Sequence, residues 1–446
     1  MLCQLTAAEA RSQIAEGQLT SVDLVKACLD RIMETDRDIG AWAHVDAMGA
    51  LEQAEQLDTI RRKGNALGAL HGVPVGLKDI FDVKGLPTEC GTPARKGTIA
   101  AADCAVAARL RDAGAVILGK TVTTEFAFLN PAHTANPRNP AHTPGGSSSG
   151  SAAAVAAGQV PLAIGTQTNG SVIRPASFCG IFGYKPTRGM ISRSGVLQTS
   201  VTLDQVGVFA RSLEDAGLLA DALAAYDPRD TASFARPRPS AAGGVTAEPP
   251  VEPDLAWIDM PYHDRLSADA RAGFEEIIEA LDGHVERIPA PKSVAELVHH
   301  QQVVHEYEIA RHLADDFGKH WDLISEKLQV VVQRGRSYSD QQYAESLSMV
   351  GGAENFFAAF FHDYDAILAP SSAGEAPLKS EGTGDPVFCT VWTVAGLPCV
   401  NLPLLSGATG LPVGVQLIGQ AERDDRLMRT ANWMIKTLAS GGEAGL

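Results

Sequence analysis

Two serine-rich loops contain the residues best suited to nucleophilic chemistry. The first, GGSSSG at 145–150, fits the pattern G-x-S-x-G with Ser148 at its centre. In that pattern the serine stands on a sharp turn between a strand and a helix. The preceding residues, NPRNPAHTP, contain three prolines, which exclude a regular central strand. The following SAAAVAA favours a helix, so Ser148 is interpreted as a loop or helix-capping residue.

The second loop, TQTNGS, is also built of small residues and ends at Ser171. An Ala-rich helix expected over 151–159 and a short strand, PLAIG, separate the two loops, so both flank one helix–strand unit. Small side chains let backbone N–H groups approach a ligand closely, as an oxyanion site requires. Pro175 suits the start of a helix, which places Ser171 near a helix N-terminus.

A nucleophilic serine needs a base, and the chain offers a lysine for this role. His71 and His142 are the histidines nearest to these motifs, and no pattern ties either to a carboxylate. In HGVPVGLKD, strand alternation puts Lys78 on the face shared with Pro74 and Gly76, which leave room around its amine. A buried lysine loses its proton more readily, because burial disfavours the charged form. The alternative is a solvated surface pair with Asp79 or Asp82.

The elements around these loops interleave helices and short apolar strands, which indicates an α/β fold. Capping patterns open helices near 7–16 and 21–34, and further helices are expected over 104–113, 269–281, much of 294–363 and from about 425. Strands are expected at AVILG, LAWID, AILAP, VNLPL and GVQLIG. GAVILGKT at 114–121 matches a nucleotide-binding pattern, but its central residues read as a core strand rather than a phosphate loop. The Pro-rich stretch at about 227–254 reads as an exposed excursion or linker.

Three long motifs together resemble the amidase signature family of serine hydrolases. They are GVPVGLKD at 72–79, GGSSSGSAAAVAAG at 145–158 and GTQTNGSVIRPASFCGIFGYKPT at 165–187. The resemblance extends over nearly the whole chain and implies one domain over 1–446, with a central mixed β-sheet covered by helices on both faces. It also implies a Ser–Ser–Lys triad in which Ser171 is the nucleophile, Ser147 follows a cis peptide bond and bridges, and Lys78 is the base. The implied oxyanion donors are Thr168, Asn169 and Gly170.

The sequence departs from the family pattern at three positions. Ser149 replaces a common glycine, Gln167 stands where Asp is frequent, and Asn169 replaces the first glycine of GGS. Asn tolerates left-handed backbone, so the oxyanion loop can survive that change, whereas Gln167 cannot carry the charge of the usual Asp. The run QTNGSVIRPAS resembles the branch that contains malonamidase, in which an arginine three residues after the nucleophile meets a substrate carboxylate.

Three residues are candidates for substrate binding. Arg174 stands at the position of that arginine; it either meets a substrate carboxylate or forms a buried structural ion pair. Phe126 and Trp392 are chosen from five residues in regions that line the acyl pocket in similar proteins, and plain core packing is the alternative for them. The five are Phe126, Phe128, Phe388, Trp392 and Thr393.

Composition narrows the function classes. The formal net charge of −16 and the lack of a basic run argue against a nucleic-acid partner. We expect no leader and no membrane-spanning segment, and therefore a cytoplasmic protein. Seven scattered cysteines without a C-x-x-C pair favour buried reduced thiols over disulfides or a zinc cluster.

The expected activity is hydrolysis of the C–N bond of small carboxamides or aryl amides, extending to carbamates (urethanes) and esters. It would proceed through an acyl-enzyme on Ser171 and would need no metal and no organic cofactor. The alternatives are a glutamine-hydrolysing A subunit of an amidotransferase and a catalytically dead scaffold. The partner is expected to be a small amide or carbamate, and a homodimer is left open.

Overall fold

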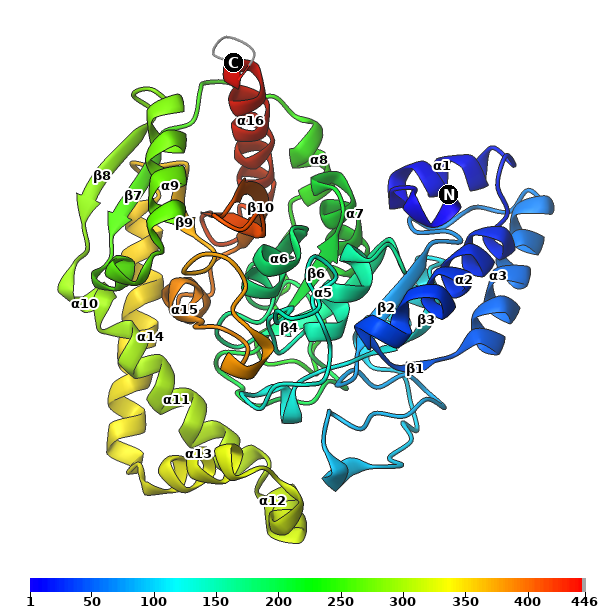
Figure 1. Cartoon of the computed structure of the whole chain (residues 1–446), viewed down its shortest axis with the longest axis horizontal. Helices are drawn as coiled ribbons and strands as arrows, with labels where there is room; N and C mark the ends of the chain where they lie inside the picture. Colours follow the sequence, from blue (N-terminus) through cyan, green and yellow to red (C-terminus); the bar gives the residue numbers. More distant parts are fainter. Residues whose placement is uncertain (443–446) are drawn as a thin grey trace.

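A mixed β-sheet forms the centre of the computed structural model, which describes residues 1–442 (Figure 1). Its 11 strands run in the order β1-β3-β2-β4-β6-β5-β10-β11-β9-β7-β8. The strands are β1 (Trp42–Val45), β2 (Pro74–Lys78), β3 (Val116–Thr121), β4 (Leu162–Gln167), β5 (Phe182–Lys185), β6 (Gln205–Ala210), β7 (Leu255–Asp259), β8 (Val285–Pro289), β9 (Ala366–Pro370), β10 (Cys399–Ser406) and β11 (Pro412–Ile418). Strand β2 pairs in parallel with β3 and β4, and β7 pairs in parallel with β8 and β9. Antiparallel pairs join these two parallel groups through β6, β5, β10 and β11.

Helices cover both faces of this sheet, as predicted. The α-helices are α1 (Ala7–Ala15), α2 (Ser21–Ile39), α3 (Ala47–Arg62), α4 (Ala105–Asp112), α5 (Ser149–Ala156), α6 (Ile173–Cys179), α7 (Leu213–Leu223), α8 (Ala241–Thr246), α9 (Ala268–Ala280), α10 (Lys292–Ala295), α11 (Leu297–His312), α12 (Ala314–His320), α13 (Glu326–Ser337), α14 (Asp340–Phe360), α15 (Val387–Val394) and α16 (Asp424–Gly442). Side chains alternate between the two faces along each strand. In β6, Val208 and Ala210 enter one core and Phe209 enters the other.

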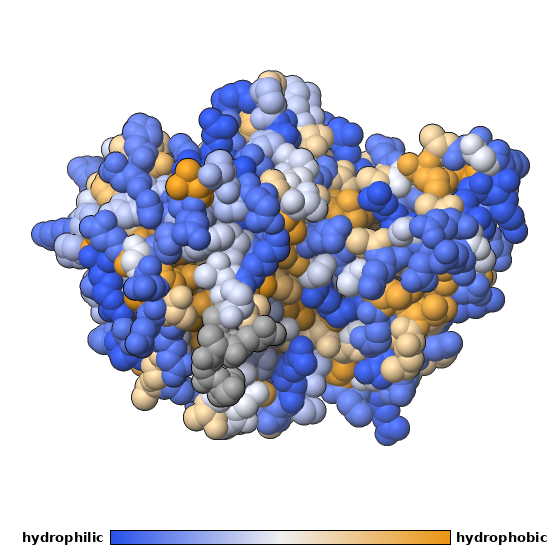
Figure 2. Space-filling model, turned by 90° about the horizontal axis from the view of Figure 1, so that it is seen from above, coloured by the Kyte–Doolittle hydropathy of each residue, from blue (hydrophilic) through white to orange (hydrophobic). Residues whose placement is uncertain are grey.

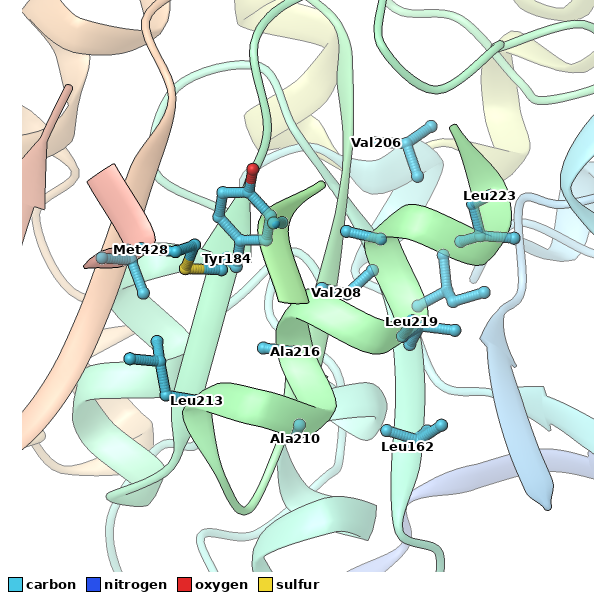
Figure 3. Close-up of a cluster of buried hydrophobic side chains, with 14 of the residues drawn as sticks. Leu162, Tyr184, Val206, Val208, Ala210, Leu213, Ala216, Leu219, Leu223 and Met428 are labelled. Carbon is cyan, nitrogen blue, oxygen red and sulfur yellow. The ribbon is translucent and has the colours of Figure 1, made fainter. Parts of the chain in front are cut away.

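The first of these cores lies between the sheet and helices α7 and α16. Val208 of β6 and Leu162 of β4 meet Leu219 of α7 there, while Met428 of α16 packs beside Tyr184 of β5 (Figure 3). The opposite face is covered by α2, α3, α5 and α6 at one end and by α14 and α15 at the other. Apolar burial on both faces is the main stabilising contribution expected for such a fold.

Local sequence signals correctly predicted many element ends. Thr6 and Glu9 form the expected capping box at α1, and the Thr20 side chain accepts a hydrogen bond from the Asp23 N–H at the start of α2. Helix α2 continues beyond the predicted end at 34 and stops at Gly40, whose φ of 64° is left-handed. Residues 116–121 of the nucleotide-binding pattern form the buried strand β3, as the sequence interpretation had it.

The Pro-rich stretch at 227–254 is packed onto the body and does not form a free linker. Asp230 is buried and paired with the guanidinium of Arg193 at 2.7 Å. Within the stretch, α8 packs against α7 and α16. Prolines interrupt regular structure here without detaching the segment, because its buried polar groups bond to the rest of the chain.

Helices α11, α12 and α13 form an arm that extends from the sheet at the lower left of Figure 1. The arm returns to the loop after β3, where Phe317 of α12 packs edge-on against Phe126 with ring centroids 5.6 Å apart. The Ser325 N–H, just before α13, donates to the Glu125 carboxylate at 2.9 Å. These contacts bring one side of α11 next to the loops that contain the candidate site.

The face seen in Figure 2 is mostly hydrophilic, with hydrophobic residues showing between polar ones. Across residues 1–442, no helix combines the length and apolar character needed to cross a bilayer. All seven cysteines are buried, as their scattered positions predicted.

Candidate active site

Lys78 stands at the end of β2 with its amine fully buried. Its Nζ donates to Ser147 Oγ at 2.7 Å and to Thr166 Oγ1 at 2.9 Å. The side chains of Trp42 and Thr121 fill the space above Gly76, so a Cβ on Gly76 would lie only 3.0 Å from each of them. The predicted free room beside the amine is therefore closed by neighbouring side chains, which keep water away from this strand.

The surface ion pair considered for Lys78 does not form. Asp79 instead accepts from Lys120 Nζ at 2.9 Å, and Lys120 also donates to Thr88 Oγ1 at 3.0 Å. Burial lowers the pKa of the Lys78 amine from 10.5 to about 7, while the negative charge of Asp204 raises it in part. A substantial fraction of this amine is consequently neutral near pH 7.

The two serines of the predicted triad come from different loops, and Ser147 is the one bonded to the Lys78 amine. Ser147 precedes α5, is 3% exposed and follows the cis peptide bond Gly146–Ser147 that the resemblance implies. Ser171 lies in the turn between β4 and α6 and lines a cavity of about 280 Å³. Ser148 occupies the N-cap position of α5, but its hydroxyl bonds to the backbone of Thr166 instead of capping the helix.

The predicted oxyanion residues Thr168, Asn169 and Gly170 also line the cavity. Within residues 1–442, the backbone N–H groups of Asn169, Gly170 and Ser171 donate to no protein acceptor. Donors that lack a protein partner and border a cavity are available to a ligand.

Histidines do not take the place of the lysine. His71 Nε2 lies 3.1 Å from the carbonyl oxygen of Leu57, and His142 Nδ1 lies 2.6 Å from that of Ala376. His305 of α11 lines the cavity, where burial lowers the pKa of its imidazole to about 4. Its Nε2 contacts the hydroxyl of Thr199 at 3.1 Å rather than a serine.

Arg174 enters the same cavity as a buried cation. Its Nη2 donates to the carbonyl oxygen of Gly146 at 2.6 Å, and its Nε and Nη1 have no hydrogen-bond partner among the described residues. None of the ion pairs formed within residues 1–442 includes Arg174. Burial lowers the pKa of this guanidinium to about 10, which leaves it charged at neutral pH. The buried ion pair considered from the sequence is therefore absent.

Phe126 and Trp392 are placed in the core and do not line this cavity. Phe126 packs on Phe317, and its neighbour Phe128 borders the cavity instead. Trp392 lies on the side of α15 that packs against Phe357, with ring centroids 5.7 Å apart. One residue in a helix is a turn of about 100°, so Thr393 points elsewhere, toward the loop of Asn169.

Several cavity residues were not found from the sequence. Gln301 and His305 come from α11, and Arg265 and Arg334 come from still other elements. These four residues belong to no motif and lie far from the serine loops along the chain. The only sequence signal was the spacing of Gln301 and His305, which are four residues apart and therefore share one face of α11. Across the described residues, no three His, Cys, Asp or Glu side chains cluster as metal ligands.

The central mixed sheet brings the two serine loops and the buried lysine to one region of an α/β fold. A family model described as Amidase matches residues 23–428, and the chain belongs to this family, whose enzymes act on the C–N bond of amides. The curated A subunit of glutamyl-tRNA(Gln) amidotransferase from Anaeromyxobacter dehalogenans is 34% identical over 492 aligned positions, which cover 98% of this chain and 97% of the relative. The match of the family model confirms the resemblance to this family that the three sequence stretches indicated.

Solved structures show the same fold. A chain from a vestigial protein complex that reveals the evolutionary origins of an s-triazine catabolic enzyme superposes with a TM-score of 0.91 at 28% identity, covering 97% of this chain and 98% of that one. The native peptide amidase from Stenotrophomonas maltophilia gives a TM-score of 0.83 at 28% identity, covering 97% and 96%. These likenesses extend over nearly the whole chain and are not confined to the serine loops.

Proposed function

We propose that this protein hydrolyses small amides through an acyl-enzyme on Ser171, with Lys78 as the base and Ser147 as the proton bridge. The observation that carries the proposal is the buried Lys78 amine, whose hydrogen-bond acceptors are the hydroxyls of Ser147 and Thr166. With a pKa of about 7, this amine is neutral in about half of the molecules at pH 7 and can then accept a proton.

The acylation step moves two protons along the bridge. Ser147 gives its proton to the neutral Lys78 amine and takes the proton of the Ser171 hydroxyl, while Ser171 Oγ bonds to the carbonyl carbon of the amide. The carbonyl oxygen becomes an oxyanion that accepts from the free N–H groups of residues 169–171. The C–N bond then breaks as the proton returns from Lys78 through Ser147 to the leaving nitrogen.

Deacylation repeats the same proton path with water. A water molecule gives a proton to the bridge as it attacks the acyl carbon, and that proton returns to Ser171 Oγ when the ester bond breaks. Carbamates and esters present the same carbonyl geometry, so they belong to the proposed substrate range.

The charge of the cavity favours substrates that carry a carboxylate. Arg265 is paired with Asp385 at 2.7 Å, and Arg334 is paired with Glu306, so the positive charge of Arg174 is the one left uncompensated among the described cavity residues. An ionised carboxylate would supply the acceptors that Nε and Nη1 of Arg174 lack. We therefore include short amides of dicarboxylic acids in the proposed substrate class, as in the malonamidase-like branch.

A fluorophosphonate tests the nucleophile without knowledge of the substrate. Wild-type protein should form an adduct on Ser171, Ser171→Ala should form none, and Ser148→Ala should still react, since Ser148 bonds only to the backbone of Thr166. Labelling at Ser148 in place of Ser171, or no labelling of folded protein, would contradict the proposal. The second result would favour the dead scaffold.

Turnover of paired substrates tests the role of Arg174. Malonamate and glutamine should be hydrolysed faster than uncharged amides of equal length. Arg174→Met should lower kcat/KM for the carboxylated member of each pair by about tenfold or more relative to the uncharged one. An equal loss for both members would remove the carboxylate from the proposed substrate class.

A second candidate function is the A subunit of an amidotransferase. The observation that favours it is the similarity to curated amidotransferase A subunits, which match 95% or more of both chains at 31% and 34% identity. It predicts turnover of glutamine alone among the amides and copurification with a second protein of the same complex. Efficient hydrolysis of other amides by the purified chain would instead support the stand-alone amidase.

A further inference from the structure

The oxyanion turn is held from its carbonyl side by side chains outside the triad. In a trans peptide unit the C=O and the following N–H point in opposite directions, so fixing one fixes the other. The unit between Asn169 and Gly170 carries the Gly170 N–H, and its carbonyl accepts from Thr393 Oγ1 at 2.5 Å. The unit before it carries the Asn169 N–H, and its carbonyl, from Thr168, accepts from Gln301 Nε2 at 3.3 Å.

Gln167 determines the direction of the hydrogen bonds that reach Thr393. Its Nε2 donates to Thr393 Oγ1 at 2.9 Å, and its Oε1 accepts from the N–H groups of Val172 and Ile173. A threonine hydroxyl has one hydrogen. Because Gln167 donates to Thr393 Oγ1, the hydroxyl hydrogen of Thr393 remains available to another acceptor. The carbonyl oxygen of Asn169, at 2.5 Å, is closer to Oγ1 than that of Cys389, at 3.0 Å.

Two of the three departures from the family pattern, Gln167 and Asn169, thus meet at the side chain of Thr393. Asn169 offers its backbone carbonyl to Thr393, while its side chain lies between Thr390 and Gln301. A carboxylate at position 167 would demand the Thr393 hydrogen for itself, and Asn169 O would lose its donor. Gln167, Thr393 and Gln301 are all 4% exposed or less, so water does not replace a lost bond freely.

We propose that Thr393 and Gln301 are positioning residues of the oxyanion hole, which aim the Gly170 and Asn169 N–H groups by holding the opposite ends of their peptide units. Gln167 sets the polarity of the Thr393 bond. This inference rests on the proposed function, because it assigns those N–H groups to the oxyanion. It concerns the transition state, so it predicts an effect on rate rather than on substrate binding.

Thr393→Val tests the proposal, since valine keeps the shape of threonine and removes the hydroxyl. We expect kcat per labelled active site to fall by about ten- to a hundredfold, with KM changed by less than about twofold. The rate of fluorophosphonate labelling should fall in parallel, and Thr393→Ser should restore most of both rates. Thr390→Val is the matched control, because Thr390 donates to the side chain of Asn169 and not to its backbone carbonyl.

Gln167→Glu is an independent test of the polarity, and it carries the proposal if the valine variant does not fold. Glutamate keeps an acceptor for Val172 and Ile173 but cannot donate to Thr393 when ionised. The single variant should resemble Thr393→Val, and the double variant should be no slower than either alone, because both break one chain of bonds. If Gln167 and Thr393 had only independent structural roles, the losses in the two single variants would instead add in the double variant.

Distinct results separate this inference from the proposed function. If wild-type Ser171 reacts and Thr393→Val reacts at the same rate as Thr390→Val, the positioning role is overturned and the hydrolase stands. A change in KM with kcat intact would also overturn it. If wild-type Ser171 does not react at all, the proposed function fails, and this inference fails with it.

Discussion

Replacing Lys78 with methionine removes the amine while keeping a long, unbranched side chain in the buried space at the end of β2. Without the base, Ser147 has no acceptor for its own proton and therefore cannot take the proton of Ser171. We expect fluorophosphonate labelling of Ser171 to slow by about 10²- to 10⁴-fold, the usual contribution of a general base. Labelling suits this measurement because it reports on the nucleophile and needs no knowledge of the natural amide.

The pH dependence of labelling in the wild type carries the quantitative form of this prediction. With a pKa of about 7, the Lys78 amine is neutral in about one tenth of the molecules at pH 6, one half at pH 7 and nine tenths at pH 8. The rate should therefore rise about tenfold between these limits and then level off. The slow residual reaction of Lys78→Met should lack this midpoint, because the group that titrates is gone.

Lys185 provides a matched control on β5. Its amine is also fully buried, and burial lowers its pKa, but it donates to Gln205 Oε1 and to backbone carbonyls rather than to a serine. Lys185→Met should keep the wild-type midpoint in the protein that remains folded. A flat wild-type profile from about pH 5.5 to about pH 9, or labelling of Lys78→Met at the wild-type rate, would refute the assignment of Lys78 as base.

Asp204→Asn should move the midpoint of the labelling profile to lower pH, because the Asp204 charge raises the pKa of Lys78; an unchanged or higher midpoint would exclude that electrostatic effect. Lys78 should also destabilise the native state. Its amine stays protonated to about pH 10 in the unfolded chain but loses its proton near pH 7 in the native state, so the free energy of unfolding rises with pH across that window. In urea unfolding, the free energy of unfolding of Lys78→Met should exceed that of the wild type most below about pH 7 and less toward about pH 10. A difference between the two proteins that does not change with pH would contradict this. Arg193→Met should lower the free energy of unfolding by about 3 kcal/mol or more, because it leaves Asp230 buried without its cation. A loss below about 1 kcal/mol in chemical denaturation would contradict this prediction.

Much of the candidate site could be predicted from the sequence because its motifs are contiguous. The strand ending at Lys78 follows from alternation over a few residues, and the two serine loops follow from their small side chains and the helix between them. The α1 capping box of Thr6 and Glu9 joins residues three apart, so local chemistry settles it. The family resemblance then implied roles for Ser147, which the structure bonds to the Lys78 amine, and for Ser171, which lines the cavity.

Predictions about side chains in the core were less successful, for a geometric reason. Phe126 and Trp392 were chosen from the five pocket candidates, yet a shift of one or two residues along a loop or helix changes the direction of the side chain. The structure puts Phe128 and Thr393 of the same set near the site instead. Residue types along the chain do not predict the direction in which each of these side chains points. Nor did it show that the Pro-rich stretch packs onto the body through the buried pair of Arg193 and Asp230.

The sequence by itself determined the type of fold, the strands and helices with strong local signals, and the two serine loops and the lysine on which the proposed function rests. Only the tertiary structure decided which groups surround them. Asp79 pairs with Lys120 and leaves Lys78 to the hydroxyls, and Nε and Nη1 of Arg174 have no hydrogen-bond partner among the described residues. Thr393 meets Gln167 across 226 residues of chain. Such contacts depend on how the strands are ordered in the sheet and on which helices cover them, and no short stretch of residues carries that information.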